Sequence, residues 1–332
     1  MQESEMHRHI YATFARDTIP GGRAIVGPGD DCAVVRSLAS DGPEILVTVD
    51  QVIEGRHFTG PLRSGHNGPG TPIDLVARKL IARSVSDIAA MAGTPTWAVA
   101  TGALPAGFNQ AMATELFDAM ARWARHWGCP LVGGDIATYC RTDTPLTLTA
   151  TVAGIPHPHR GAVLRSGARI GDSVYVTGKI GNSFASGRHL TFEPRVIEAR
   201  WLADVLGDSL HAMIDVSDGL GMDAGRVALA SGAAIALDAA AIPLHENAQS
   251  WQTAIADGED YELVFTCDAA SQVPPHCPHT GTAITRIGTV VRITDTSPAG
   301  SVVVRDQHTT GAPKVYNVAD AGWDHGRSDR AR

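Results

Sequence analysis

Carboxylates recur where apolar runs meet glycines, and they are the most informative chemistry in the chain. The aspartates in such settings are Asp30, Asp31, Asp50, Asp135, Asp215, Asp218 and Asp223. We expect them where strands end and turns begin. A single Asp before Gly is also an ordinary turn or helix-cap residue. The repetition of the pattern favours one shared site.

Asp87 is a further carboxylate, set within an apolar segment. Residues 72–91, PIDLVARKLIARSVSDIAAM, have apolar side chains at helical spacing, which predicts a buried helix. An ionised carboxylate buried there destabilises the fold unless a partner offsets its charge. Arg83, one turn earlier, is a possible structural partner. Divalent cations are the alternative, and Mg²⁺ prefers carboxylate oxygens. We favour the metal, because the other aspartates fit the same pattern.

The usual phosphate-binding and hydrolytic motifs are absent from the sequence. It contains no G-x-x-x-x-G-K-[ST], no G-x-G-x-x-G after a strand, no G-x-S-x-G and no H-E-x-x-H. Lys and Arg number 27 against 35 Asp and Glu, which gives a net charge of −8. We therefore expect no nucleic-acid partner. Bound cations would allow such an acidic protein to hold a polyphosphate.

Alternating strand and helix patterns must position these carboxylates. Strands are predicted at 44–50, 146–154 and 173–178, and a helix at 110–127, which indicates an α/β fold. A chain of 332 residues predicts about two domains, at roughly 100–200 residues each. The Gly, Pro and His residues near position 156 place the boundary, giving domains 1–155 and 156–332.

The sequence also limits where the protein is found. No apolar stretch approaches a membrane span, and the start MQESEMHRHIYATFARD lacks the pattern of a secretion signal. The five cysteines are scattered, which is typical of reduced thiols. We expect a cytoplasmic protein with no membrane partner.

A series of motifs runs in order over most of the chain. It comprises GPGDDCAVV, VTVDQVIEGRHF, VSDIAAMAGTP, LVGGD, LRSGARIGDSVYVTG, FEPR, MIDVSDGL and DGEDYELVF. This series resembles the thiamine-monophosphate kinase family, within the superfamily that also holds aminoimidazole ribonucleotide synthetase. GRHF and GEDYEL favour the kinase branch in particular.

The resemblance implies a fold, an assembly and a set of site residues. It implies two α/β domains and a homodimer whose N-terminal mixed sheets join in a barrel-like interface, with ATP bound there. The implied Mg²⁺ ligands are Asp31, Asp50, Asp87, Asp135, Asp215 and Asp218, with Thr48 near one ion. The implied ATP contacts are Gly134, Asp135, Arg165 and Ser217, and thiamine monophosphate would be held by His57, Glu259 and Trp323.

The implied reaction explains why these residues include no general base. The phosphate of thiamine monophosphate is largely a dianion at pH 7, because its second pKa is about 6. It is therefore already a nucleophile. The site must bring two anions together in line and screen their repulsion, so metals and positioning carry the catalysis.

Four positions depart from the family's usual pattern, which has Thr, Asn, Thr and Gly where this chain has Val49, Ser84, Ile136 and Asp257. Two of these changes remove oxygen ligands near the metals, and Arg83 adds a cation beside the site. Two alternatives to the kinase stay open. One is a related ATP-dependent enzyme that acts on another small molecule, and the other is a nucleotide-binding protein without turnover.

Overall fold

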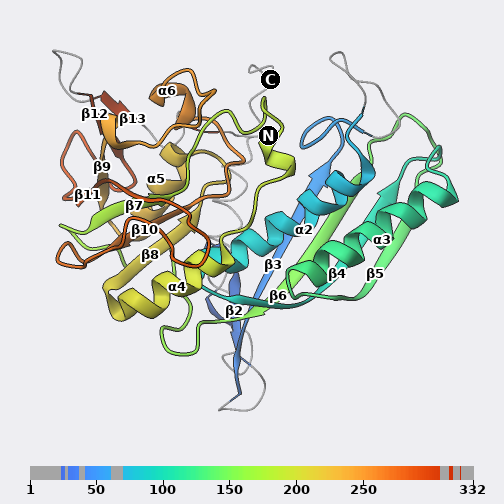
Figure 1. Ribbon diagram of the computed structural model, residues 1–332, viewed down its shortest axis with the longest axis horizontal. Helices are drawn as coiled ribbons and strands as arrows, with labels where there is room; N and C mark the ends of the chain where they lie inside the picture. Colours follow the sequence, from blue (N-terminus) through green and yellow to red (C-terminus); the bar gives the residue numbers. More distant parts are fainter. Residues whose placement is uncertain are drawn as a thin grey trace.

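The computed structural model describes residues 24–26, 29–36, 42–60, 70–306, 314–316 and 322. They form two mixed β-sheets with helices packed against them (Figure 1). One sheet uses strands up to Ile155 and the other uses strands from Ser173 onward. The α/β class predicted from the sequence is confirmed at this level.

The first sheet has six strands in the order β1-β2-β3-β6-β4-β5. Its strands are β1 Ala24–Val26, β2 Ala33–Arg36, β3 Glu44–Ile53, β4 Thr94–Leu104, β5 Leu131–Thr138 and β6 Thr147–Ile155. Neighbouring strands are antiparallel except β4 and β5. The sheet therefore ends on one side in a parallel strand, β5, which has one neighbour, β4, among the described strands.

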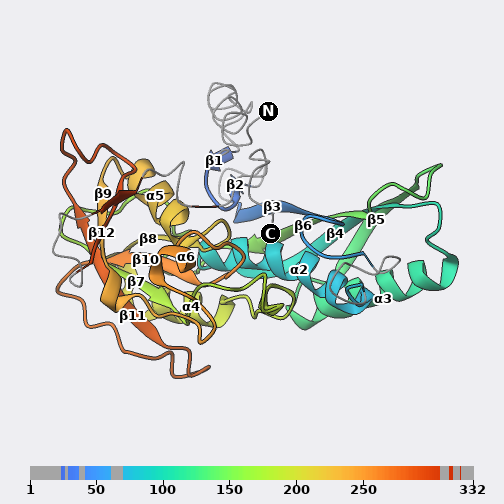
Figure 2. The ribbon, with the colours of Figure 1, turned by 90° about the horizontal axis from the view of Figure 1, so that it is seen from above.

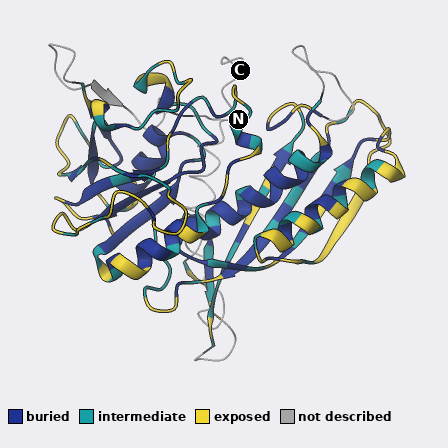
Figure 3. Ribbon diagram, viewed as in Figure 1, coloured by how far each residue is buried: buried dark blue, intermediate teal, exposed yellow. Residues whose placement is uncertain are grey.

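Two helices, α2 Ile73–Ala90 and α3 Gln110–His126, cover one face of this sheet (Figure 2). The strands alternate accordingly: in β3, Leu46, Thr48 and Val52 are buried on the helical side, whereas Val49 is exposed on the other side. No helix of the described residues covers the opposite face. Strand β5 is exposed along most of its length (Figure 3).

Helix α2 is the central element of the molecule. It follows Pro72 and carries Asp74 in its first turn, where a negative charge favours the helix dipole. It ends at Ala90, and Ala92, two residues later, takes a left-handed conformation with φ 56°. It packs against the first sheet, and it also contacts β8 of the second sheet and helix α4 (Figure 1).

The second sheet has seven strands in the order β13-β12-β9-β11-β7-β10-β8. They are β7 Ser173–Thr177, β8 Leu210–Asp215, β9 Ala234–Asp238, β10 Leu263–Cys267, β11 Ile284–Val291, β12 Val302–Arg305 and β13 Lys314–Tyr316. The helices of this half are α4 Val196–Leu206, α5 Leu220–Ala230, α6 Trp251–Ala254 and the short turns η1 Arg188–Leu190, η2 Gly207–Ser209 and η3 Ala239–Ala241. Strand β8, fully buried, lies at the edge of this sheet and contacts α2.

Most of the predicted elements appear within one to three residues of their expected ends. Strands β3, β6 and β7 and helices α2 and α3 confirm the predicted pattern. The expectation that the aspartates follow strand ends is correct for Asp215, the last residue of β8. It is wrong for Asp50 and Asp135, because β3 and β5 each continue three residues beyond them. Hydrogen bonding to neighbouring strands extends both elements past the carboxylate.

None of the helices in the described part of the chain is long and apolar enough to cross a membrane.

Candidate active site

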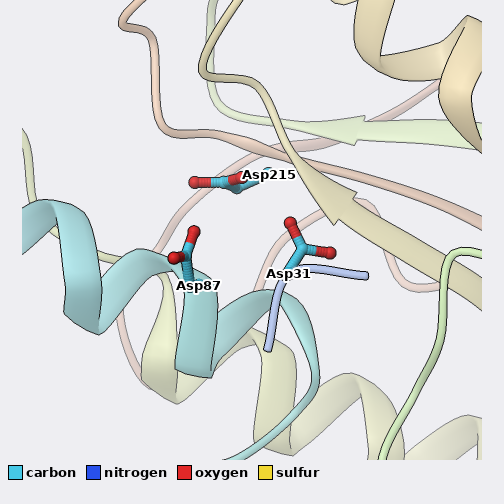
Figure 4. A group of neighbouring side chains, drawn as sticks. All are labelled: Asp31, Asp87 and Asp215. Atoms are coloured by element: carbon cyan, nitrogen blue, oxygen red, sulfur yellow. The ribbon is translucent and has the colours of Figure 1, made fainter. Parts of the chain in front are cut away.

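Three carboxylates from distant parts of the sequence converge beside the last turns of α2. Asp31 comes from the bend before β2, Asp87 from α2 and Asp215 from the end of β8. Each offers an oxygen within 4.8 Å of the others, and Figure 4 shows the three side chains directed toward one another. We refer to Asp31, Asp87 and Asp215 as the carboxylate triad.

Hydroxyl groups and one arginine hold the triad in place. Thr48 of β3 donates a hydrogen bond to Asp87. Ser86 donates to Asp215 Oδ2 at 2.6 Å, so consecutive residues of α2 contact two different elements. Arg165 donates two hydrogen bonds to Asp31, at 2.8 Å and 3.1 Å. These contacts fix the side-chain directions that local sequence cannot specify.

The triad carries more negative charge than its surroundings neutralise. Burial raises the pKa of Asp87 well above its usual value, and the carboxylates of Asp50, Asp215 and Asp31 raise it further. The pKa of Asp215 is raised by burial and by Asp31. Close carboxylates in a buried setting bind protons or cations to relieve this repulsion. Oxygen-only donors at this separation fit Mg²⁺, which the family resemblance implies.

Asp50 and Asp218, two further predicted ligands, lie outside the triad and are paired with arginines. Arg83 of α2 contacts Asp50 with 3.3 Å between Nη2 and Oδ1. Arg226 of α5 contacts Asp218 at 2.6 Å. Both carboxylates are partly exposed. The structure therefore places Asp50 and Asp218 at the edge of the site, with their charges matched in the single chain.

Asp223 fixes the loop between β8 and α5. Its Oδ2 accepts hydrogen bonds from the backbone N–H groups of Ser217, Asp218 and Gly219, at 3.0 to 3.1 Å. Burial raises the pKa of Asp223 to about 7 even though Arg226 lowers it. Asp223 is therefore the structural aspartate of this motif, and it holds Ser217 and Asp218 beside the triad.

A second buried cluster lies nearer the N-terminus of α2, around Lys79. Lys79 Nζ contacts Glu259 Oε2 at 2.8 Å, His189 Nδ1 at 2.7 Å and the backbone oxygen of His57 at 2.8 Å. Burial alone would raise the pKa of Glu259, but the charge of Lys79 and the contact with His189 hold it far below its usual range. We call Lys79, His189, Glu259 and His57 the substrate-side cluster, because the family resemblance implies that His57 and Glu259 contact the substrate.

The structure brings His57 and Glu259 together, as two residues of one site require. Glu259 adopts φ 64°, a left-handed conformation that is rare for this residue type. The strain is held by backbone hydrogen bonds to the loop after β8, such as that from Glu259 N to Ser217 O at 2.7 Å. Backbone strain of this kind is common at functional sites. The third predicted substrate contact, Trp323, lies outside the described residues.

Gly134 and Asp135 do not join the triad within one chain. They lie on exposed strand β5, and in the sheet register Asp135 aligns with Thr101, Thr149 and Gln51 on successive strands. Three strand spacings of about 4.8 Å thus separate it from β3. Its row faces the open side of the sheet, because Val49, two residues from Gln51, is exposed there.

The four departures from the family pattern have separate surroundings. Val49 and Ile136 are 63% and 56% exposed, and Val49 lies on the sheet face opposite the triad. Buried Ser84 donates to the backbone oxygen of Ala150 at 3.3 Å. Asp257 accepts a hydrogen bond from Asn182 N at 2.8 Å. None of the four contacts a triad carboxylate among the described residues.

Sequence reasoning missed Lys79, His189 and Arg226. Lys79 is fully buried in α2, and it precedes Arg83 and Asp87 at four-residue intervals. That spacing was a readable signal, because residues four apart share a helix face. His189 had no such signal: a short turn far along the chain brings it to Glu259.

Comparison with known proteins places this arrangement in a class. The family model for AIR synthase related protein, N-terminal domain, matches residues 29–156, which include two of the triad residues. A solved structure described as AaThiL complexed with AMPPCP and TMP is 25% identical, with a TM-score of 0.70. The match covers 98% of this chain and 97% of that one. The first half of the chain thus resembles the N-terminal domain of AIR synthase-related proteins, and the chain as a whole shares the fold of that solved structure.

Two curated relatives narrow the class to a family. The thiamine-monophosphate kinase of Rhodopirellula baltica is 34% identical over 320 residues, covering 92% of this chain and 93% of the relative. That of Escherichia coli K12 is 31% identical over 268 residues, covering 73% of this chain and 76% of the relative. The chain belongs to the thiamine-monophosphate kinase family.

Proposed function

We propose that this protein transfers the γ-phosphoryl group of ATP to the phosphate of thiamine monophosphate, forming thiamine diphosphate and ADP. The observation that carries the proposal is the pair of sites on one helix. Asp87 of α2 belongs to the carboxylate triad, and Lys79 of the same helix belongs to the substrate-side cluster. The relatives' names and the bound AMPPCP and TMP of the similar structure support the same reaction.

The chemistry requires positioning rather than proton abstraction. An oxygen of the acceptor phosphate forms a bond to the γ-phosphorus, and the bond between that phosphorus and the oxygen bridging to the β-phosphate breaks. Because the acceptor is largely a dianion at pH 7, no side chain has to remove a proton. The residues of this chain bind the two anions, align them and exclude water from between them.

The triad fits Mg²⁺ by its donor set. Asp31, Asp87 and Asp215 would hold the cation, with Thr48 and Asp50 close by. Bound Mg²⁺ supplies charge neutralisation for the phosphates. Arg165, paired with Asp31, lies beside the triad, and this position supports its expected contact with ATP. Ser217, held by Asp223, offers a second polar contact.

We further propose that the protein works as a homodimer in the cytoplasm. The exposed strand β5 and the open sheet face support the dimer, because an unprotected strand edge with apolar side chains favours pairing with another chain. Val132 on β5 is 66% exposed. In such a dimer, Gly134 and Asp135 would approach the nucleotide from the shared interface.

An assay of the purified protein tests the proposed function. With ATP, Mg²⁺ and thiamine monophosphate, we expect thiamine diphosphate and ADP in equal amounts, with no product when Mg²⁺ is chelated. Unphosphorylated thiamine is the matched control and should give no diphosphate. ADP release with other small phosphorylated acceptors, but not with thiamine monophosphate, would instead indicate the related enzyme. Nucleotide binding without ADP under any condition would indicate the non-catalytic protein.

A further inference from the structure

Arg83 lies midway between the two halves of the proposed site. Lys79, Arg83 and Asp87 follow one another at four-residue intervals along one side of α2. Each interval corresponds to about 6 Å along the helix axis. Lys79 belongs to the substrate-side cluster and Asp87 to the carboxylate triad. Arg83 is therefore the cation placed where the two substrates would meet.

The hydrogen-bonding capacity of Arg83 is only partly used. Nη1 donates to the backbone oxygen of Gln51 at 2.9 Å, and Nη2 lies 3.3 Å from Asp50 Oδ1. Nε is buried and finds no hydrogen-bond partner among the described residues. A guanidinium has five N–H donors in a planar fork, so Arg83 retains donors for an anion.

The other arginines of the site are more firmly engaged. Arg165 holds Asp31 with two hydrogen bonds, the shorter of 2.8 Å. Arg226 bridges two carboxylates at 2.5 Å and 2.6 Å. The carboxylate contact of Arg83, at 3.3 Å, is the longest of these pairs. An arriving phosphate dianion would thus compete more readily for Arg83 than for Arg165 or Arg226.

Arg83 is a fixed positive charge among acidic neighbours. Asp50, Glu259 and Asp87 lie within electrostatic range of it, so the rest of its surroundings would repel an anion. Beside these carboxylates, a phosphate group needs a fixed positive charge as well as metal ions. Arg83 is 16% exposed, which leaves it accessible from the site while its stem stays packed in α2.

We propose that Arg83 binds the phosphate of the acceptor and positions it for transfer, so that Arg83 selects phosphorylated over unphosphorylated thiamine. This inference rests on the proposed function, since it assumes an acceptor anchored at the substrate-side cluster. The alternative is a purely structural role, in which Arg83 only neutralises Asp50. The two roles differ in one measurable respect, the contribution of the ligand's phosphate to binding.

The test measures binding of thiamine monophosphate and of thiamine by calorimetry, with Mg²⁺ and a non-hydrolysable ATP analogue present. For Arg83→Gln we expect about 10- to 100-fold weaker binding of thiamine monophosphate, the loss typical of a charge-assisted hydrogen bond. Binding of thiamine and of the ATP analogue should stay within about twofold. Arg83→Lys, which keeps the charge but loses the fork, should fall between wild type and Arg83→Gln.

Arg122→Gln is the matched control, because Arg122 is an exposed arginine of α3 paired with Asp74. It should leave both affinities unchanged. If wild type and Arg83→Gln bind thiamine monophosphate equally well, this inference is wrong and the proposed function stands. The same holds if Arg83→Gln loses affinity equally for thiamine monophosphate and thiamine. If wild type does not bind thiamine monophosphate under any condition, the proposed function is wrong as well. If Arg83→Gln melts below the assay temperature, Arg83→Lys decides instead. The quantity compared is then the loss of affinity for thiamine monophosphate relative to the loss for thiamine.

Discussion

Asp87 and Asp215 illustrate how burial and neighbours change a common side chain. Each is an ordinary aspartate by sequence, yet burial and nearby carboxylates raise the pKa of both. Thr48 and Ser86 donate hydrogen bonds that partly offset this effect. A raised pKa means that the folded state holds protons more tightly than the unfolded chain, so ionisation destabilises the fold.

Replacing Asp87 by Asn tests the metal role. The unfolded pKa of Asp is about 3.9, so the folded protein loses stability as pH rises from there through the raised pKa. Without metal, Asp87→Asn should therefore melt at or above the wild-type temperature at pH 8, and the gain should shrink toward pH 5. Stabilisation by Mg²⁺ with an ATP analogue should disappear, and activity should fall about 100-fold or more. Thermal melts with and without both ligands measure this.

Asp74→Asn is the control for that experiment, because Asp74 lies on the same helix and is paired with Arg122. It should keep the full Mg²⁺ and nucleotide shift. An unchanged shift in Asp87→Asn would exclude Asp87 as a ligand. A large loss of stability in Asp87→Asn without metal would instead indicate a structural ion pair.

At the scale of elements, α2 joins the two halves of the site and β5 borders the sheet. Helix α2 supplies Lys79, Arg83 and Asp87 from one side while its apolar residues pack against the first sheet. Among the described strands, β5 pairs with β4 alone. At Gly134 the backbones approach so closely that a Cβ atom would overlap the carbonyl oxygen of Ala100.

The adjacent glycines of β5 offer a matched pair of variants. Gly134→Ala should force β5 away from β4 and lower the free energy of unfolding by about 1–3 kcal/mol, the range typical of overpacking. Gly133→Ala should be close to neutral, since its Cβ would lie an ordinary 3.7 Å from Val99. Denaturant unfolding of the two proteins gives the comparison. Equal stability would show that β5 relaxes without cost.

At the scale of the whole molecule, the described part of the chain leaves one face of the first sheet and the edge at β5 uncovered. Figure 3 shows α2 and β8 buried, in contrast to the exposed β5. The residues expected to bind metal and nucleotide are divided between these regions, with the triad of expected Mg²⁺ ligands in the interior and Gly134 and Asp135 on the exposed strand. A second copy of the chain would cover the edge and complete the site.

Charge placed on the exposed edge tests this assembly. We expect wild type to scatter light as a dimer of the 34.9 kDa chain at micromolar concentration, and Val132→Lys to scatter as a monomer. The lysine should cost the isolated fold little, because Val132 is 66% exposed. Leu229→Lys introduces the same charge on α5 at a 60% exposed position and should leave the dimer intact. Identical masses for wild type and Val132→Lys would argue against an interface at β5.

Local sequence determined the elements and the kind of chemistry. Apolar residues at helical spacing predicted α2, and alternating runs predicted β3 and β6, because each periodicity reflects one buried face. Aspartates beside glycines indicated a cation site before any fold was known. These features depend on residues close together in the chain.

The tertiary structure alone decided which of those residues meet. It joined Asp31, Asp87 and Asp215, left Asp135 on an exposed edge, and paired Lys79 with Glu259 and His189. Such contacts depend on how the sheets pack around α2, and periodicity within one segment carries no information about the partner of its buried face. The predicted ligand set was thus a list of residue types, and packing between distant segments turned part of it into a site.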